Sequence, residues 1–161
     1  MDAVADEALI SVRTLYRHYP EASSVVVAAL AHSLSWTAPP ELDVAASRPL
    51  HERSAAVVGA WTRAAESNLV LWALAAAIPV DDLDVVASLA ESRAAGRHQL
   101  RGVFARELGR REGPARSMML DAVESAVSVA SWYGLRTDQG LAGTRAKRIT
   151  EAMILGALNL R

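Results

Sequence analysis

The hydrophobic positions of this 161-residue chain recur every three or four residues, which is the spacing of an amphipathic helix. The final segment shows this most clearly, because Ile149, Ala152, Met153, Gly156 and Ala157 fall on a single stripe. No segment alternates apolar and polar residues as a half-buried strand does, and no internal repeat is visible. The pattern therefore predicts an all-α protein of about eight or nine helices.

Prolines, glycines and capping residues divide this pattern into separate segments. Pro20 and Pro49 suit the first turn of a helix, whereas Pro39 and Pro40 stop one. The expected helices span residues 1–8, 12–18, 21–36, 50–66, 69–78, 83–111, 115–133 and 142–160. Residues 41–48 are expected to form a linker or a short turn of helix, and residues 134–140 a loop.

The composition supports helices and narrows the possible functions. The chain contains 32 alanines, which favour helices, and only 5% aromatic residues. Charges almost cancel, with 17 Lys and Arg against 18 Asp and Glu, so no bulk electrostatic attraction to nucleic acid or anionic membranes is expected. The chain has no cysteine, which excludes disulfides, thiolate zinc sites and cysteine nucleophiles.

Targeting signals and membrane spans are not expected. Asp2, Asp6 and Glu7 make the first residues acidic, unlike the start of a signal peptide. The longest apolar run covers 69–80, contains Pro79 and is shorter than the roughly 20 residues that span a bilayer. We expect a cytoplasmic protein with no membrane partner.

No arrangement of residues in the sequence predicts catalysis. His51 and Glu52 begin a zinc-helix motif, but position 55 is Ala where the second histidine is needed. Asp81, Asp82 and Asp84 lack the glycine turn and distal glutamate of a calcium loop, which favours helix capping. We therefore expect no enzymatic activity, no metal and no cofactor.

A basic stretch lies in the second half of the chain. Its members are Arg97, Arg101, Arg106, Arg110, Arg111 and Arg116. On a long helix such a stretch usually forms a solvated face, which is the favoured interpretation. A second nucleic-acid surface is the alternative.

Residues 4–19 have the spacing of two short helices joined by a tight turn, which is the arrangement of a helix-turn-helix. Ser11 is the expected N-cap of the second helix. Arg13 and Arg17 lie one turn apart on one face, where they could reach phosphates or base edges. Leu15 and Tyr19 would face inward and hold this helix to its neighbours.

In this segment the chain resembles the TetR/AcrR family of bacterial transcription regulators. The run from Ser11 to Tyr19 is similar to that family's recognition helix, typically S-x-x-T-L-Y-x-H-F. Residues 135–141, before the last helix, also resemble the family. The resemblance implies a homodimer in which residues 1–36 form a truncated helix-turn-helix with its connecting helix, and residues 37–161 form a helical ligand-binding and dimerisation bundle.

The resemblance also implies which residues contact operator DNA. Ser11, Thr14 and Tyr16 would contact phosphates. Val12 and Arg13 would contact bases in the major groove. Arg17 and His18 would lie near the DNA backbone. The implied activity is ligand-responsive regulation of transcription, most simply repression.

Three departures from the family pattern concern the DNA-reading end. The chain begins in what would be the second helix, so a first helix is expected to be missing. Leu9 stands where the family usually has glycine in the turn, and a positive φ there would cost about 1 kcal/mol. Glu21 and its neighbours supply no basic side chain at the start of the following helix. The alternative is a small-molecule-binding helical dimer with a degraded or truncated DNA-binding end.

Large side chains among the many alanines suggest a pocket for a mainly apolar small molecule. The candidate pocket residues are Trp61, Trp72, Phe104 and Met118. The other interpretation is that each aromatic side chain simply fills the core.

The last two long helices are expected to form the dimer surface, because small residues allow helices to approach closely. The candidate interface residues are Ala122, Ala126, Ala130, Ile149, Met153 and Gly156. Burial of these residues inside one subunit is the alternative.

Overall fold

The computed structural model describes residues 1–36, 40, 42–67, 69 and 83–159. Within these ranges the chain forms nine α-helices, one π-helical segment and no strand, which confirms the expected all-α class for the part described. None of the helices there is long and apolar enough to cross a bilayer.

The helices fall into three groups along the chain. The N-terminal group is α1 (Asp2–Glu7), α2 (Val12–His18) and α3 (Ala22–Trp36). The middle group is α4 (Leu50–Ser67), α6 (Leu83–Val103) and α7 (Ala105–Leu108). The C-terminal group is α8 (Gly113–Val127), α9 (Val129–Tyr133), the π-helical segment η1 (Gly134–Asp138) and α10 (Gly143–Leu158). Most of the helix expected over 69–78 lies outside the described residues.

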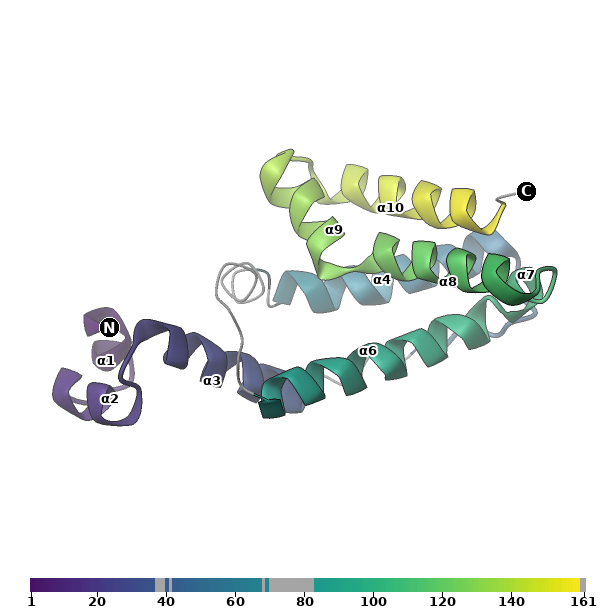
Figure 1. Cartoon of the computed structure of the whole chain (residues 1–161). Coiled ribbons are helices and arrows are strands. Elements are labelled where there is room, and N and C mark those ends of the chain that lie inside the picture. The colour runs from purple at the N-terminus through teal and green to yellow at the C-terminus, as the bar shows by residue number, and fades with distance from the viewer. Residues whose placement is uncertain (37–39, 41, 68, 70–82, 160–161) are drawn as a thin grey trace.

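One long helix joins the two ends of the molecule. α1 and α2 pack against each other at one end, and α3 leads away from them to pack on α6 (Figure 1). At the other end α4, α8 and α10 form a bundle, to which α6 is joined through α7 and α8. α6 therefore contacts both the N-terminal helices and the bundle.

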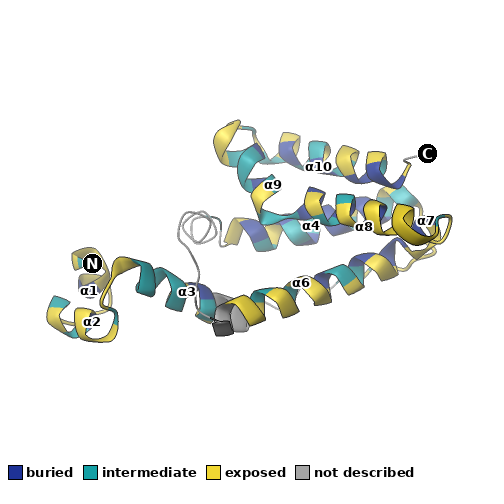
Figure 2. Ribbon diagram, in the orientation of Figure 1, coloured by how far each residue is buried: buried dark blue, intermediate teal, exposed yellow. Residues whose placement is uncertain are grey.

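The main core lies between α4, α6, α8 and α10. Val57, Phe104, Val123 and Ile154 are fully buried there. A smaller cluster forms around Trp132, where α4, α9, η1 and α10 meet. Figure 2 shows that buried positions gather in the bundle, whereas much of α1 and α2 is exposed.

A buried ion pair ties α4 to the junction between α6 and α7. The Arg53 guanidinium donates to both carboxylate oxygens of Glu107, at 2.9 and 2.8 Å. It also donates to the carbonyls of Arg48 and Val103, at 2.8 and 2.6 Å, and lies 5.9 Å from the centre of the Phe104 ring. Arg53 is 1% and Glu107 4% exposed, so the two charges compensate each other away from water.

The helix expected over 115–133 is interrupted at Ser128. This residue has extended backbone angles, with φ −62° and ψ 150°. Its hydroxyl oxygen accepts from the Ser131 N–H at 3.1 Å and donates to the Ser125 carbonyl at 2.8 Å. The side chain thus ends α8 and caps α9, which corrects the prediction of one continuous helix.

Two other predicted boundaries are also corrected. The long helix expected over 83–111 ends at Val103, and Phe104, with φ −103° and ψ 21°, separates it from α7. The loop expected over 134–140 begins as the π-helical segment η1, whose Leu135 is buried against Trp132 in the smaller cluster. Burial of Leu135 explains why this segment is ordered as a helical turn.

The single hydrophobic stripe expected on the final helix, α10, is divided between a buried face and an exposed face. Ala146, Thr150 and Ile154 point into the bundle, whereas Met153 and Gly156 are exposed. Thr150 belongs to the buried face, but its hydroxyl makes it a polar residue, so the hydrophobic pattern did not include it. In the fold it donates to the Ala146 carbonyl at 3.1 Å, so the buried hydroxyl is satisfied.

We expect Glu107→Gln to lower the free energy of unfolding by about 3 kcal/mol, because it leaves a buried guanidinium without its counter-charge. The matched control is Glu52→Gln, which breaks the more exposed Arg48–Glu52 pair and should cost less than about 1 kcal/mol. Urea unfolding followed by circular dichroism measures both changes. Equal losses in the two variants would contradict a special role for the buried pair.

The same pair predicts a pH dependence of stability. The hydrogen bonds from Arg53 hold the pKa of Glu107 below its ordinary value of 4.5. A lowered pKa in the folded state gives stability that is complete above the unfolded value and is lost as the pH falls through the folded value. The stability gap between wild type and Glu107→Gln should therefore be constant between about pH 7 and 5.5 and shrink below about 4.5.

Candidate nucleic-acid interface and central cavity

The start of α2 is fixed by its own side chains. Ser11 has extended backbone angles, and its hydroxyl oxygen accepts from the Thr14 N–H at 3.1 Å. The two hydroxyls are also 2.8 Å apart, within hydrogen-bond distance. Ser11 is therefore the N-cap of α2, as the sequence predicted, and the observed helix covers the expected residues 12–18.

The two faces of α2 differ sharply in burial. Leu15 is 3% exposed, and on α1 Ala5 is fully buried. Arg13, Arg17 and His18 are exposed on the same helix. This separation confirms Leu15 as an inward residue and leaves a polar surface on the other side.

The outward face of α2 carries uncompensated positive charge. The side chains of Arg13 and Arg17 make no ion pair or hydrogen bond with the described residues. Tyr16 presents a 49% exposed side chain between them, while Val12 and Thr14 are partly buried. The guanidinium groups of Arg13 and Arg17 and the hydroxyl of Tyr16 lie within about one turn of the helix. They can donate hydrogen bonds to the phosphates of a nucleic acid.

The turn between α1 and α2 is strained at the residue that the sequence singled out. Leu9 has φ 54°, the left-handed region that a residue with a Cβ rarely adopts. Its side chain is 93% exposed, so it gains almost nothing from packing. The conditional cost of a positive φ at this position therefore applies to Leu9.

The start of α3 presents an acidic side chain. Ser23 donates its hydroxyl to the Glu21 carboxylate at 3.1 Å, and Ser24 donates to the Glu21 carbonyl at 2.6 Å. These contacts hold Glu21 at the start of α3, so a negative charge follows α2 closely in the chain. A DNA phosphate that approaches the start of α3 would be repelled by the Glu21 carboxylate, because no basic side chain is present there.

A cavity of about 350 Å³ lies between α4, α6, α8 and α9, and we call it the central cavity. Trp61, Leu100 and Val127 supply apolar walls. The polar lining residues are Ser92, Arg93, Arg97, Glu124 and Ser128. Its volume is within the range of cavities that hold small molecules. The arrangement fits a mainly apolar molecule with one polar group.

The polar part of the central cavity is built around Arg97. Its guanidinium lies 2.6 Å from a carboxylate oxygen of Asp121 and 2.5 Å from one of Glu124. The hydrogen bond to Glu124, followed by the one to Asp121, raises the pKa of Arg97. This network joins α6 to α8 at one wall of the cavity. Nothing in the spacing of 97, 121 and 124 marks them as partners, so the sequence did not predict it.

The four predicted pocket residues have different environments. Trp61 lines the central cavity, and Trp72 lies outside the described residues. Phe104 is fully buried in the core beside Arg53 and is not among the lining residues, so there the core-filling interpretation holds. Met118 is 58% exposed on α8 and is not a lining residue either.

The six predicted interface residues also separate into groups. Met153, Gly156 and Ala130 are exposed, and Ala130 also lines the central cavity. Ala122 and Ile149 are partly buried. Ala126 is only 2% exposed within the single chain, because it belongs to the core, and it is not available at the surface.

Comparison of the chain with protein-family models, with characterised proteins and with solved structures gives no match. In the described ranges, no three His, Asp or Glu side chains gather into a group that could hold a metal ion.

We expect Leu9→Gly to stabilise the α1–α2 pair by about 1 kcal/mol, because glycine adopts a positive φ without steric cost. The matched control is Leu9→Ala, which removes the same exposed side chain but keeps the Cβ and should give no gain. Amide hydrogen exchange at Leu15 and Tyr19 is the measurement, since both amides are bonded within α2. Protection should rise about fivefold in the glycine variant only. An equal rise in both variants would show that the strain is not at the backbone.

Proposed function

We propose that this protein is a ligand-responsive transcriptional regulator of the TetR type, most simply a repressor, that binds operator DNA as a homodimer in the cytoplasm. The observation that carries the proposal is α2 itself. A serine-capped helix buries Leu15 and turns Arg13, Tyr16, Arg17 and His18 outward. That arrangement matches what a recognition helix needs to enter a major groove. The proposal requires no enzymatic activity and no cofactor.

The position of α6 supports a link between ligand and DNA. Arg97 and Leu100 of α6 line the central cavity, and α6 also packs on α3, which follows α2. A mainly apolar molecule in the cavity would favour one position of α6 over another. Through α3 this would change the spacing of the two recognition helices in a dimer and so the affinity for operator half-sites.

The outward faces of α8 and α10 support the proposed dimer. α8 and α10 pack against each other, and Met118 and Met153 are 58% and 43% exposed there. At Gly156 an added Cβ would meet nothing within 4 Å, so a second helix can approach closely. A pair of helices from each chain would form a four-helix interface.

A second candidate function is a ligand-binding helical dimer whose DNA-reading end is degraded. Two observations favour it, the strained non-glycine turn at Leu9 and the acidic Glu21 at the start of α3. Both weaken contacts that a DNA-reading end uses. The central cavity and the exposed face of α10 serve this function equally well, so DNA binding is the property that separates the two candidates.

We expect the protein to bind the DNA upstream of its own gene, with an affinity that falls as the salt concentration rises. Arg17→Gln should reduce the slope of log K against log salt by about one unit, because it removes one phosphate contact. Arg63→Gln, at an exposed position on α4, is the matched control and should leave the slope unchanged. Fluorescence anisotropy at several salt concentrations gives these slopes. Absence of binding, or equal slopes in all three proteins, favours the second candidate.

We expect the wild-type protein to have twice the mass of the 17.2 kDa chain in light scattering at micromolar concentration. Met153→Glu should weaken the dimer at least about 100-fold, because it buries an unpaired charge at the interface. Val86→Glu is the control, since Val86 is an apolar residue of α6 that is 46% exposed. A monomeric wild type, or dissociation by Val86→Glu alone, would contradict the proposed interface.

A further inference from the structure

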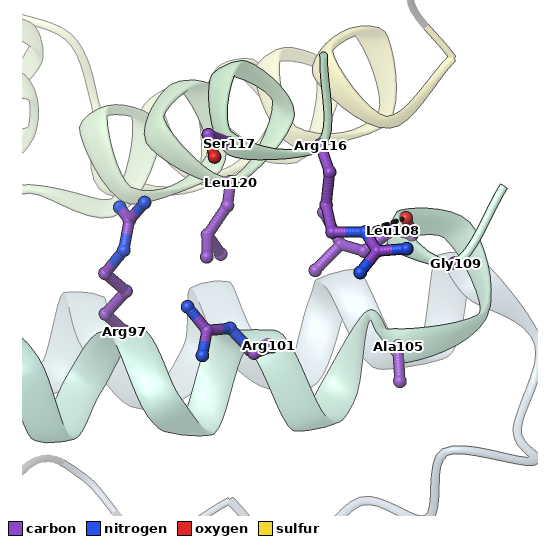
Figure 3. Close-up of a pocket in the computed structure, with 8 residues that line it drawn as sticks. All are labelled: Arg97, Arg101, Ala105, Leu108, Gly109, Arg116, Ser117 and Leu120. Atoms are coloured by element: carbon purple, nitrogen blue, oxygen red, sulfur yellow. Dashed lines mark hydrogen bonds between the residues drawn. The ribbon is translucent and has the colours of Figure 1, made fainter. Parts of the chain in front are cut away.

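A second cavity, of about 390 Å³, lies where α6, α7 and α8 meet. We call it the arginine cavity, because Arg97, Arg101 and Arg116 line it together with Ser117, Leu108 and Leu120. Figure 3 shows Arg97 and Arg101 rising from α6 toward α8, and Arg116 reaching from the start of α8 toward α7. The basic stretch noted in the sequence is therefore partly gathered around one hollow.

The three arginines differ in how far their charge is compensated. Arg97 is paired with Asp121 and Glu124, neither of which is among the residues that line this cavity. Arg101 takes part in no recorded ion pair or hydrogen bond within the described ranges. No carboxylate side chain is among the lining residues. The charge that remains available comes from Arg101 and Arg116.

Arg116 is held in place by backbone groups and not by an acid. Its Nε donates to the Leu108 carbonyl at 3.1 Å and to the Arg111 carbonyl at 2.9 Å. Both bonds share the single Nε–H, and the two terminal nitrogens make no hydrogen bond to the described residues. A guanidinium anchored in this way loses little conformational freedom when it binds an anion.

The other walls of the cavity are apolar. Leu108 and Leu120 are each 3% exposed, and Ala105 adds a third small apolar surface. Ser117 of α8 adds a hydroxyl to the lining (Figure 3). The cavity thus combines two available cations, one hydroxyl donor and an apolar floor.

We propose that the arginine cavity binds a small organic anion, a carboxylate or phosphate group carried on a short apolar body. Arg101 and the terminal nitrogens of Arg116 bind the anionic group, and the apolar body contacts Leu108 and Leu120. A nucleic-acid backbone suits the site less well, because it has no apolar part to cover those leucines. The site does not depend on the proposed function, since DNA binding and the central cavity do not enter this argument.

Such a ligand would bridge the C-terminal half of α6 to the start of α8. Arg97 lines both cavities and forms part of the wall between them. An anion beside Arg97 would compete with Asp121 and Glu124 for its guanidinium. The occupied arginine cavity would thereby alter the polar wall of the central cavity.

The test uses octanoate as the probe, with octanamide as the neutral analogue and inorganic phosphate as the anion without an apolar body. We expect calorimetry to find one octanoate site per chain and at least tenfold weaker binding of the other two probes. Arg101→Gln should weaken octanoate binding about tenfold or more without changing the urea midpoint, because this side chain contacts no recorded partner. Arg101→Lys should recover part of the affinity.

Two controls locate the site. Arg106→Gln removes the same charge from an exposed position on α7 that does not line the cavity, and should leave octanoate affinity unchanged. Ala64→Leu narrows only the central cavity and should also leave it unchanged. The proposal is overturned if octanoate does not bind, if octanamide binds as tightly, or if either control variant loses as much affinity as Arg101→Gln.

Discussion

The buried Arg53–Glu107 pair is the constraint on which the arrangement of the bundle depends. It joins the first turns of α4 to the α6–α7 junction and adds a hydrogen bond to the carbonyl of Val103, where α6 ends. A guanidinium that is 1% exposed is tolerated only if its donors find acceptors, and this one bonds to two carbonyls and a bidentate carboxylate. The C-terminal end of α6 is thereby fixed relative to α4. The Phe104 ring, which lies beneath the Arg53 guanidinium, is fixed with it.

This fixed end gives α6 its importance for the proposed function. The helix contributes side chains to both cavities and packs on α3, the helix that leads to α2. A helix held firmly at one end and lined by cavities along its length can respond to a bound molecule by shifting its other end. The Arg97 network with Asp121 and Glu124 is the second tie between α6 and α8, and it lies between the two cavities. A ligand in either cavity would therefore act on the same helix.

Much of the secondary structure was predictable, because it depends on contacts within one or two turns. The bounds of α2 and the Ser11 cap follow from residues three positions apart. The break at Ser128 could have been found in the same way, since its partners are Ser125 and Ser131. The break at Ser128 was not predicted, because the apolar stripe continues on both sides of it. For the candidate recognition helix, the inward position of Leu15 and the exposure of the arginines were both predictable.

The sequence by itself determined the all-α class of the described chain and the short capped helix with its outward cations, because each rests on local hydrogen bonds and helical periodicity. Only the tertiary structure decided which polar residues are buried and which face of α10 is exposed. Arg53 and Glu107 are 54 positions apart, and an arginine on an amphipathic helix is stable in water without any partner. The same holds for the basic stretch. Its sequence was compatible with a solvated face, but where α8 packs on α6 three of its arginines line a cavity. The charges of two of them, Arg101 and Arg116, are not compensated there by an acid.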